Sequence, residues 1–459
     1  MIVHLNLLSN YKKTMKQLIL LLLISLLVYS CCDEDVIQDT SKIKDFHQHY
    51  YETDKQQLST NVDLYVDYST CLSQKETVKS AFYKAIHPKI IACTPNYWSI
   101  KGENIKNESG DVYTLLNSIV EVNYADLKRT VEKIVQGKNQ AILITDGEYY
   151  KVNSTGSNFN NPYLSESFTK WLKAGHDIYI YSEPYREANR YEKYRYYFVF
   201  TDRDLEDNIF HKISKDIDLG QVKLTKLSST DFKVFTEYEG VTQPKVNPVL
   251  SINPVSYFAE NSFEFQEYQI EWTDIVEYIQ FATDPTTGAQ LEGGDFVLRG
   301  IFIDTKSLEY FTIEDIEVKT YNVFDAFRSF EDSSFSPKSD ELIEIKELFS
   351  IDEVAFQKTG EVVLKVHKNF NGIGLNTKAD CPQKENLFKV DIVISRAKDN
   401  FTERKQEFNV FKFTSIDGNQ NESIYQSIKN TLEVDGINPK KVNKGILYTI
   451  YIKTPTSNL

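Results

Sequence analysis

The chain is poor in glycine, proline and basic residues, and each shortage excludes a class of protein. Only 18 Gly and 12 Pro occur among 459 residues, which argues against extended low-complexity disorder. Lys and Arg number 52 against 66 Asp and Glu, so the net charge is −14. Because nucleic-acid binding depends on neutralising phosphates, this balance argues against a nucleic-acid partner. What remains is a globular chain long enough for two or three domains.

Cysteine is also scarce. The five residues are Cys31, Cys32, Cys71, Cys93 and Cys381, and none has C-x-x-C spacing. Thiols scattered in this way do not indicate a disulfide framework. The seven histidines are equally scattered, so the sequence predicts no zinc site.

Only one long apolar run stands out, at residues 18–28, and three lysines precede it. It is too short for a membrane-spanning helix and predicts a secretory signal peptide over residues 1–30, with Met15 as the expected start. The run ends in LVYSC, which resembles a bacterial lipobox. That resemblance implies cleavage before Cys31 and acylation of the Cys31 thiol.

Residues 31–60 are polar and contain the acidic sequence CDED directly after the lipobox cysteine. This sequence resembles the export signal that places lipoproteins of the Bacteroidetes on the outer face of the outer membrane. We therefore expect residues 31–60 to be an acidic, polar tether. The protein would contact the membrane through its N-terminal lipid and be exposed at the cell surface.

Two short strands that end in aspartate organise the next part of the chain. Residues 61–71 read NVDLYVDYSTC and residues 141–148 read AILITDGE, so that Asp67 and Asp146 each follow a β-branched and aromatic run. Helical apolar patterns alternate with strands from residue 61 to residue 218, and residues 112–122 read as a third strand with its loop. This alternation predicts an α/β domain with a doubly wound, mostly parallel sheet. Ligands bind at the carboxyl ends of such strands, so both carboxylates would face one site.

These two motifs resemble the von Willebrand factor type A family. The family has a D-x-S-x-S run after its first strand, matched here by Asp67 and Ser69, with Cys71 in place of the second serine. Its T-D-G turn is matched by Thr145, Asp146 and Gly147. The resemblance implies a metal-ion-dependent adhesion site that binds Mg²⁺ or Mn²⁺ and a protein partner.

The resemblance also assigns the ligands of this ion. Asp67, Ser69 and Asp146 would bind it directly or through water, and Cys71 would be a poor ligand, because a hard cation prefers oxygen. The family's middle threonine has no clear counterpart, since Ala125 lies nearest its place. Asn123 or Asp126 would supply an oxygen instead.

From residue 219 the pattern changes to alternating apolar runs separated by turns, which predicts β-sandwich-like domains at 219–335 and 336–459. Residues 408–413 read as one of these strands, and a helix is expected at 422–432. The aromatic and basic segment 185–197 is interpreted as an exposed helix or loop that leads into a strand. Whether the β-rich part binds carbohydrate stays open.

Three functions follow from these patterns. The first is a cell-envelope lipoprotein that binds a protein partner through the type A-like domain, with or without a divalent cation. The second is a structural scaffold of an envelope assembly with a degenerate metal site. The third is a metal-dependent hydrolase, although no catalytic constellation is seen and we expect no enzyme activity.

Overall fold

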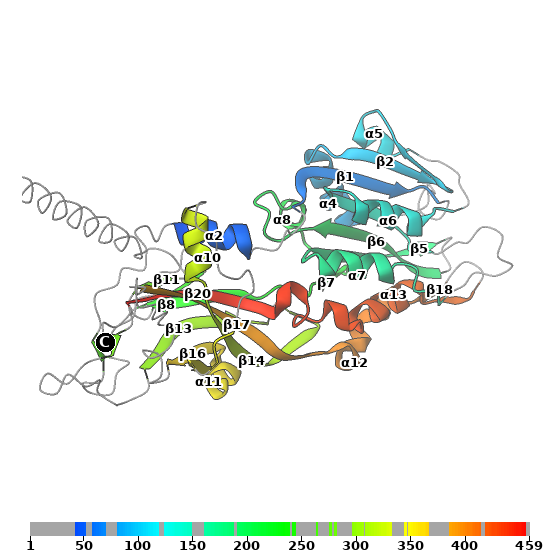
Figure 1. Ribbon diagram of the computed structural model, residues 1–459. Coiled ribbons are helices and arrows are strands. Elements are labelled where there is room, and N and C mark those ends of the chain that lie inside the picture. The colour runs from blue at the N-terminus through cyan, green and yellow to red at the C-terminus, as the bar shows by residue number, and fades with distance from the viewer. Residues whose placement is uncertain are drawn as a thin grey trace, which may run out of the picture.

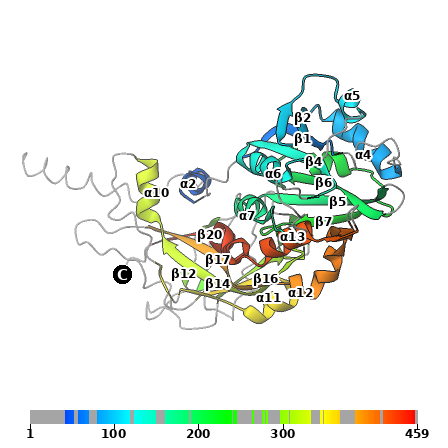
Figure 2. The same cartoon turned by 90° about the vertical axis from the view of Figure 1, so that its right-hand side faces the viewer.

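The structure is a computed structural model, shown from two sides in Figures 1 and 2. It describes residues 42–51, 57–69, 80–118, 124–148, 160–187, 191–238, 241–244, 263–264, 275–277, 280–281, 296–306, 308–332, 344–346, 348–366, 385–414 and 418–455. The predicted signal peptide, Cys31, Asn123 and Cys71 lie outside these ranges.

Seven strands form the sheet of the N-terminal α/β domain, in the order β3-β2-β1-β4-β6-β5-β7. Their bounds are β1 Ser59–Asp67, β2 Asn96–Lys101, β3 Asn104–Asn107, β4 Asn139–Thr145, β5 Asp177–Glu187, β6 Tyr191–Thr201 and β7 Lys223–Leu227. β1 is paired in parallel with β2 and β4, whereas the other four pairings are antiparallel. The predicted α/β class is confirmed.

Helices cover both faces of this sheet (Figure 1). α6 (Leu127–Gln136) and α7 (Ser165–Lys173) bury their apolar stripes in one core, and α4 (Ala81–Ala92) and α8 (Ile209–Ser214) bury theirs in a second. The sheet is therefore covered on both faces, as parallel strands rich in β-branched residues require.

The last strands of the sheet differ from the predicted alternation. β6 pairs with β5 as an antiparallel hairpin and lies between β5 and β4. The segment predicted to be exposed belongs to this hairpin, where Lys193 is 1% and Arg195 is 5% exposed. Both faces of β6 carry large apolar side chains, so the strand is central. β7 then extends the sheet past residue 218, where the sequence placed the domain boundary.

The strand expected from residue 112 is wrong over residues 112–118, the part that the structure describes. The chain forms α5 (Val112–Leu116) there, because the side chain of Asp111 accepts a hydrogen bond from the Thr114 backbone N–H at 2.8 Å and so caps a helix.

Two further sheets form a β-rich unit, which lies below the α/β domain in Figure 1. Their strand orders are β15-β16-β13-β8-β9 and β11-β20-β17-β14. The bounds are β8 Lys233–Tyr238, β9 Val241–Pro244, β11 Ile275–Glu277, β13 Phe296–Asp304, β14 Phe311–Asn322, β15 Phe349–Ile351, β16 Glu361–Val366, β17 Glu385–Asp399 and β20 Ile446–Pro455. Each sheet contains strands from both sides of residue 335, so the boundary expected there does not separate two sheets. The short strands β10 (Phe263–Glu264) and β12 (Gln280–Phe281) pair with each other, and α11 (Glu353–Thr359) precedes β16.

A helical region of the β-rich unit reaches the α/β domain, and we call it the bridging segment (residues 401–414 and 418–437). It contains α12 Phe401–Arg404, the 3₁₀-helix η2 Lys405–Phe411, β18 Phe413–Thr414, β19 Gln420–Asn421, α13 Ser423–Leu432 and the 3₁₀-helix η3 Asp435–Ile437. The predicted helix at 422–432 is confirmed as α13, whereas the strand predicted at 408–413 is mostly 3₁₀-helix. A last 3₁₀-helix, η4 (Val442–Gly445), leads into β20.

The bridging segment joins the two units through one continuous apolar core. α13 lies beside α7 (Figures 1 and 2), and the Leu164 backbone N–H donates a hydrogen bond to Ser427 Oγ at 3.1 Å. Buried residues from α7, β6, α13 and β17 belong to the same core cluster. The two units therefore share a core and are not connected by a linker alone.

One helix from the expected tether is packed against the β-rich unit. α2 (Lys42–Tyr50) buries Ile43 and Phe46 against α10 (Phe324–Glu331) and β20. His47 Nδ1 lies 2.8 Å from the Tyr451 hydroxyl. Across the described ranges, no helix has the length and apolarity needed to cross a membrane.

Candidate functional site

The two predicted aspartates lie at the same edge of the sheet. Asp67 is the last residue of β1, and Asp146 directly follows β4, which is the parallel neighbour of β1. Asp67 is 3% and Asp146 is 2% exposed. The parallel pairing predicted from the sequence thus brings two buried carboxyl groups together.

Hydrogen bonds hold the Asp67 carboxyl in place. Its Oδ1 accepts from the Ser69 backbone N–H at 2.7 Å, and its Oδ2 accepts from the Thr145 hydroxyl at 2.7 Å. Burial, followed by the nearby charge of Asp146, raises the pKa of Asp67 from 3.8 to about 7, although the hydrogen bonds from Ser69 and Thr145 lower it. The desolvation of the carboxylate therefore outweighs its hydrogen bonding.

The turn after β4 is built around Asp146 and Gly147. Asp146 Oδ1 accepts a hydrogen bond from the Glu148 backbone N–H at 3.0 Å, and Thr145 Oγ1 accepts one from the Gly147 N–H at 3.0 Å. Gly147 has a φ of +76°, a conformation that glycine adopts without steric cost. The T-D-G sequence thus forms a tight turn that fixes the direction of the Asp146 side chain.

A buried lysine lies against this turn. Lys193 Nζ is 2.7 Å from Glu148 Oε1 and 3.6 Å from Asp146 Oδ2. A buried ammonium needs opposite charges beside it, and these two carboxylates supply them. Lys193 was not among the predicted site residues.

The bridging segment covers the same edge. A Cβ atom on Gly147 would lie 2.1 Å from Ile424 Cδ1, so the α13 side chain already fills the space beside the turn. The ring of Phe413 has its centroid 5.7 Å from Lys193 Nζ. The Tyr196 hydroxyl on β6 donates to the Val410 carbonyl at 2.8 Å. This acidic edge is therefore part of the junction between the two units.

The other predicted ligands have different positions. Ser69 is buried next to Asp67, so it does belong to the acidic edge. Asp126 is the N-cap of α6, where it accepts from the Arg129 backbone N–H at 3.0 Å. Cys71 lies outside the described residues. Within the described ranges, no three His, Cys, Asp or Glu side chains form a group that could hold a metal ion.

Lys193 opposes the binding of a divalent cation to the Asp146 oxygen that it faces. Mg²⁺ binds oxygen ligands at about 2.1 Å. An ion on the Asp146 oxygen that Lys193 faces would be within about 6 Å of the ammonium. At an effective dielectric constant of about 20, the repulsion between the two cations is on the order of 5 kcal/mol. Asp67, Ser69 and Asp146 retain suitable oxygens, but Lys193 already faces the Asp146 carboxylate.

Sequence reasoning missed Lys193 for an identifiable reason. Along β6, large aromatic side chains occur at every second position, 194, 196, 198 and 200, and the basic residues Lys193 and Arg195 occupy positions between or before them. A repeat of two residues is the period of a strand. This alternation could have predicted a strand through Lys193. It could not have predicted the antiparallel pairing with β4 that places Lys193 next to Asp146.

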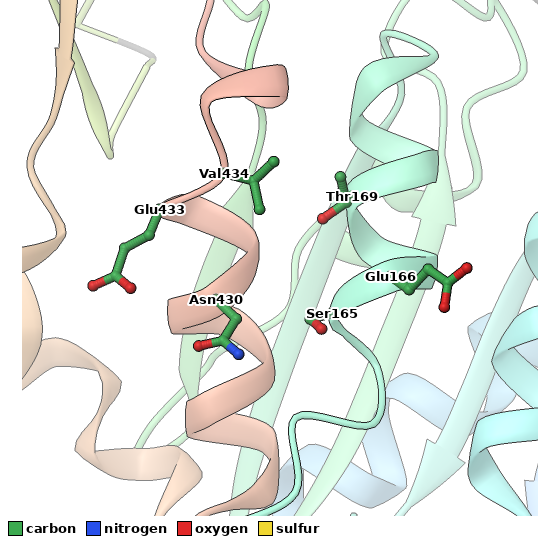
Figure 3. Close-up of a pocket in the computed structure, with 6 residues that line it drawn as sticks. All are labelled: Ser165, Glu166, Thr169, Asn430, Glu433 and Val434. Atoms are coloured by element: carbon green, nitrogen blue, oxygen red, sulfur yellow. The ribbon is translucent and has the colours of Figure 1, made fainter.

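A separate pocket of about 490 Å³ lies between α7 and α13. It is lined by Ser165, Glu166, Thr169, Asn430, Glu433 and Val434. Figure 3 shows the carboxylates of Glu166 and Glu433 pointing away from each other. The pocket therefore marks the groove between the two units and does not bring acidic groups together.

Comparison with known proteins does not assign the chain to a family. No protein-family model matches it, and no curated protein matches its sequence.

Proposed function

We propose that the protein is a lipid-anchored envelope scaffold that binds protein partners without a divalent cation. The observation that carries this proposal is the contact between the acidic edge and the bridging segment, seen at Gly147 and Ile424. In the family that the sequence resembles, partners bind at this edge. Here the chain's own α13 and β18 lie there, so partners of this protein would bind elsewhere on its surface.

The type A resemblance is part of the proposal. It is supported by β1 and β4 pairing in parallel with Asp67 and Asp146 at their carboxyl ends. The lipid anchor at Cys31 and the position at the outer surface of the outer membrane rest on the N-terminal sequence alone.

A second candidate is cation-dependent partner binding, which is favoured by one observation. The charge of Asp146 helps to raise the pKa of Asp67, so the two carboxyl groups are close enough to repel each other, and a divalent ion would relieve that repulsion. Lys193 weighs against this candidate. The metal-dependent hydrolase gains no supporting group in the described part of the chain.

The two candidates differ in their response to chelation. The full-length tagged protein would be cross-linked to its partners in intact cells, or left uncross-linked, and purified from detergent-solubilised envelopes with either millimolar EDTA or millimolar Mg²⁺. We expect the same partner proteins in the same amounts under both conditions. If partners that were not cross-linked are lost in EDTA and recovered in Mg²⁺, the scaffold proposal is wrong and cation-dependent binding is favoured. The absence of any cross-linked partner would overturn both.

A further inference from the structure

The position of Lys193 follows from the register of the β5–β6 hairpin. Tyr196 pairs with Thr145, the last residue of β4, and Lys193 pairs with Tyr185 on β5. Lys193 therefore lies just past the carboxyl end of β4, next to the turn that contains Asp146. Its side chain reaches the carboxylates from a strand that runs antiparallel to β4.

The surroundings of the Lys193 ammonium are those of a bound cation. Two carboxylates, from Asp146 and Glu148, lie 3.6 Å and 2.7 Å from Nζ, and the Phe413 ring lies on another side of it. These groups come from the turn after β4 and from β18, so two segments distant in sequence converge on one ammonium. An aromatic face and carboxylates are both favourable neighbours of a buried cation.

We propose that the Lys193 ammonium is a built-in cation of the type A-like site, held at the Asp146 carboxylate, which the resemblance makes a ligand of the divalent metal ion. The inference deepens the proposed function and rests on it in taking this edge as the counterpart of the family's adhesion site. Lys193 supplies one positive charge, which Asp146 and Glu148 share. The junction with the bridging segment is thereby independent of the metal concentration outside the cell.

The acidic edge should behave differently when the charge of Lys193 is removed. Without its ammonium, the edge still contains the Asp67 and Asp146 carboxyl groups and the Ser69 hydroxyl, which are the oxygen types that Mg²⁺ and Mn²⁺ bind. Removing the charge of Lys193 should therefore create a divalent-cation site. The neutral variant should depend on that cation for its stability, because buried carboxylates without a counter-charge destabilise the fold.

Purified full-length protein tests this without any partner. The variants are Lys193→Met, which removes the charge and keeps the apolar stem, and Lys193→Arg, which keeps the charge. Lys193→Met combined with Asp146→Asn removes a carboxylate as well. Each would be titrated with Mn²⁺, with bound ion counted by electron paramagnetic resonance and the thermal midpoint followed in parallel.

We expect the wild type and Lys193→Arg to bind no Mn²⁺ at this edge at millimolar concentration. Lys193→Met should bind about one ion and melt at a higher temperature with it, and the double variant should lose both effects. Mn²⁺ bound to the wild type and abolished by Asp146→Asn would overturn the proposal. A folded Lys193→Met that gains no ion would overturn it too. If Lys193→Met fails to fold without metal, recovery of its folded state by Mn²⁺ supports the proposal, and failure to recover while Lys193→Arg folds contradicts it. These outcomes are separate from the partner experiment, which measures release by EDTA.

Discussion

Asp67 allows a quantitative test of the acidic edge, because its carboxyl is buried only in the folded chain. Burial and the charge of Asp146 raise the pKa of Asp67 from 3.8 to about 7. In the unfolded chain the same group ionises near its ordinary value, about 4. Between about pH 4 and about pH 7, the folded state therefore retains a proton that the unfolded state has lost.

The sign of the effect follows from this difference in bound protons. The free energy of unfolding falls with rising pH wherever the folded state holds more protons than the unfolded state. Each pKa unit is worth about 1.4 kcal/mol, so the contribution of Asp67 is a loss on the order of 4 kcal/mol. The loss begins near the unfolded pKa and is complete above the folded one.

Asp67→Asn should remove this loss while keeping the shape of the side chain. The amide oxygen can accept from the Ser69 N–H, and the amide nitrogen can donate to Thr145 Oγ1. Both side-chain positions of residue 67 stay hydrogen-bonded, and only the Thr145 hydroxyl proton loses its acceptor. At about pH 8 we expect the variant to be more stable than the wild type by up to about 4 kcal/mol. Near pH 4 the two should be similar.

Urea denaturation followed by fluorescence at several pH values between about 4 and 8 measures this difference. Asp126→Asn is the matched control, because Asp126 caps α6 and asparagine caps helices about as well; its curves should follow those of the wild type. If Asp67→Asn were less stable than the wild type at pH 8, or if its stability fell with pH as steeply, the account of Asp67 would be refuted.

Two other predictions concern the junction and the anchor. Gly147→Ala should destabilise the protein by about 2–5 kcal/mol, because alanine is strained at a φ of +76° and its Cβ would overlap Ile424 Cδ1. Adding Ile424→Ala should cost less in that variant than in the wild type, as a double-mutant cycle of urea unfolding would measure; strictly additive costs would contradict the contact. Cys31→Ala should move the protein from the membrane fraction to the soluble fraction on cell fractionation, and retention as firm as that of the wild type would disprove the lipid anchor.

Local patterns predicted much of the α/β domain. The strands that lead to Asp67 and Asp146, the amphipathic stripe of α6 and the late helix α13 each depend on residues close in sequence, and each is present. The alternation of strands and helices predicted that the two strands pair in parallel, which places Asp67 and Asp146 at the same edge of the sheet, as β1 and β4 do. The Asp67 and Asp146 pair therefore followed from sequence alone.

The rest depends on contacts between distant residues. Lys193 meets Asp146 only because β6 pairs antiparallel with β4, and no local pattern specifies that pairing. Leu164 and Ser427 are hydrogen-bonded although 263 residues separate them. Residues 408–413 look like a strand because their apolar residues alternate in part, but Phe408 and Phe411 are buried from a 3₁₀-helix. At residues 408–413, tertiary packing overrides the local preference.

The docking of α2 has a mechanical consequence for an anchored protein. Phe46 is fully buried against the β-rich unit, so α2 is part of the folded body. The residues between Cys31 and Lys42 can extend to at most about 40 Å. With Cys31 acylated, this short distance would keep the face that carries α2 and α10 near the bilayer. It would also limit how far the molecule can tilt. A pull between the anchor and a bound partner would act on the packing of α2.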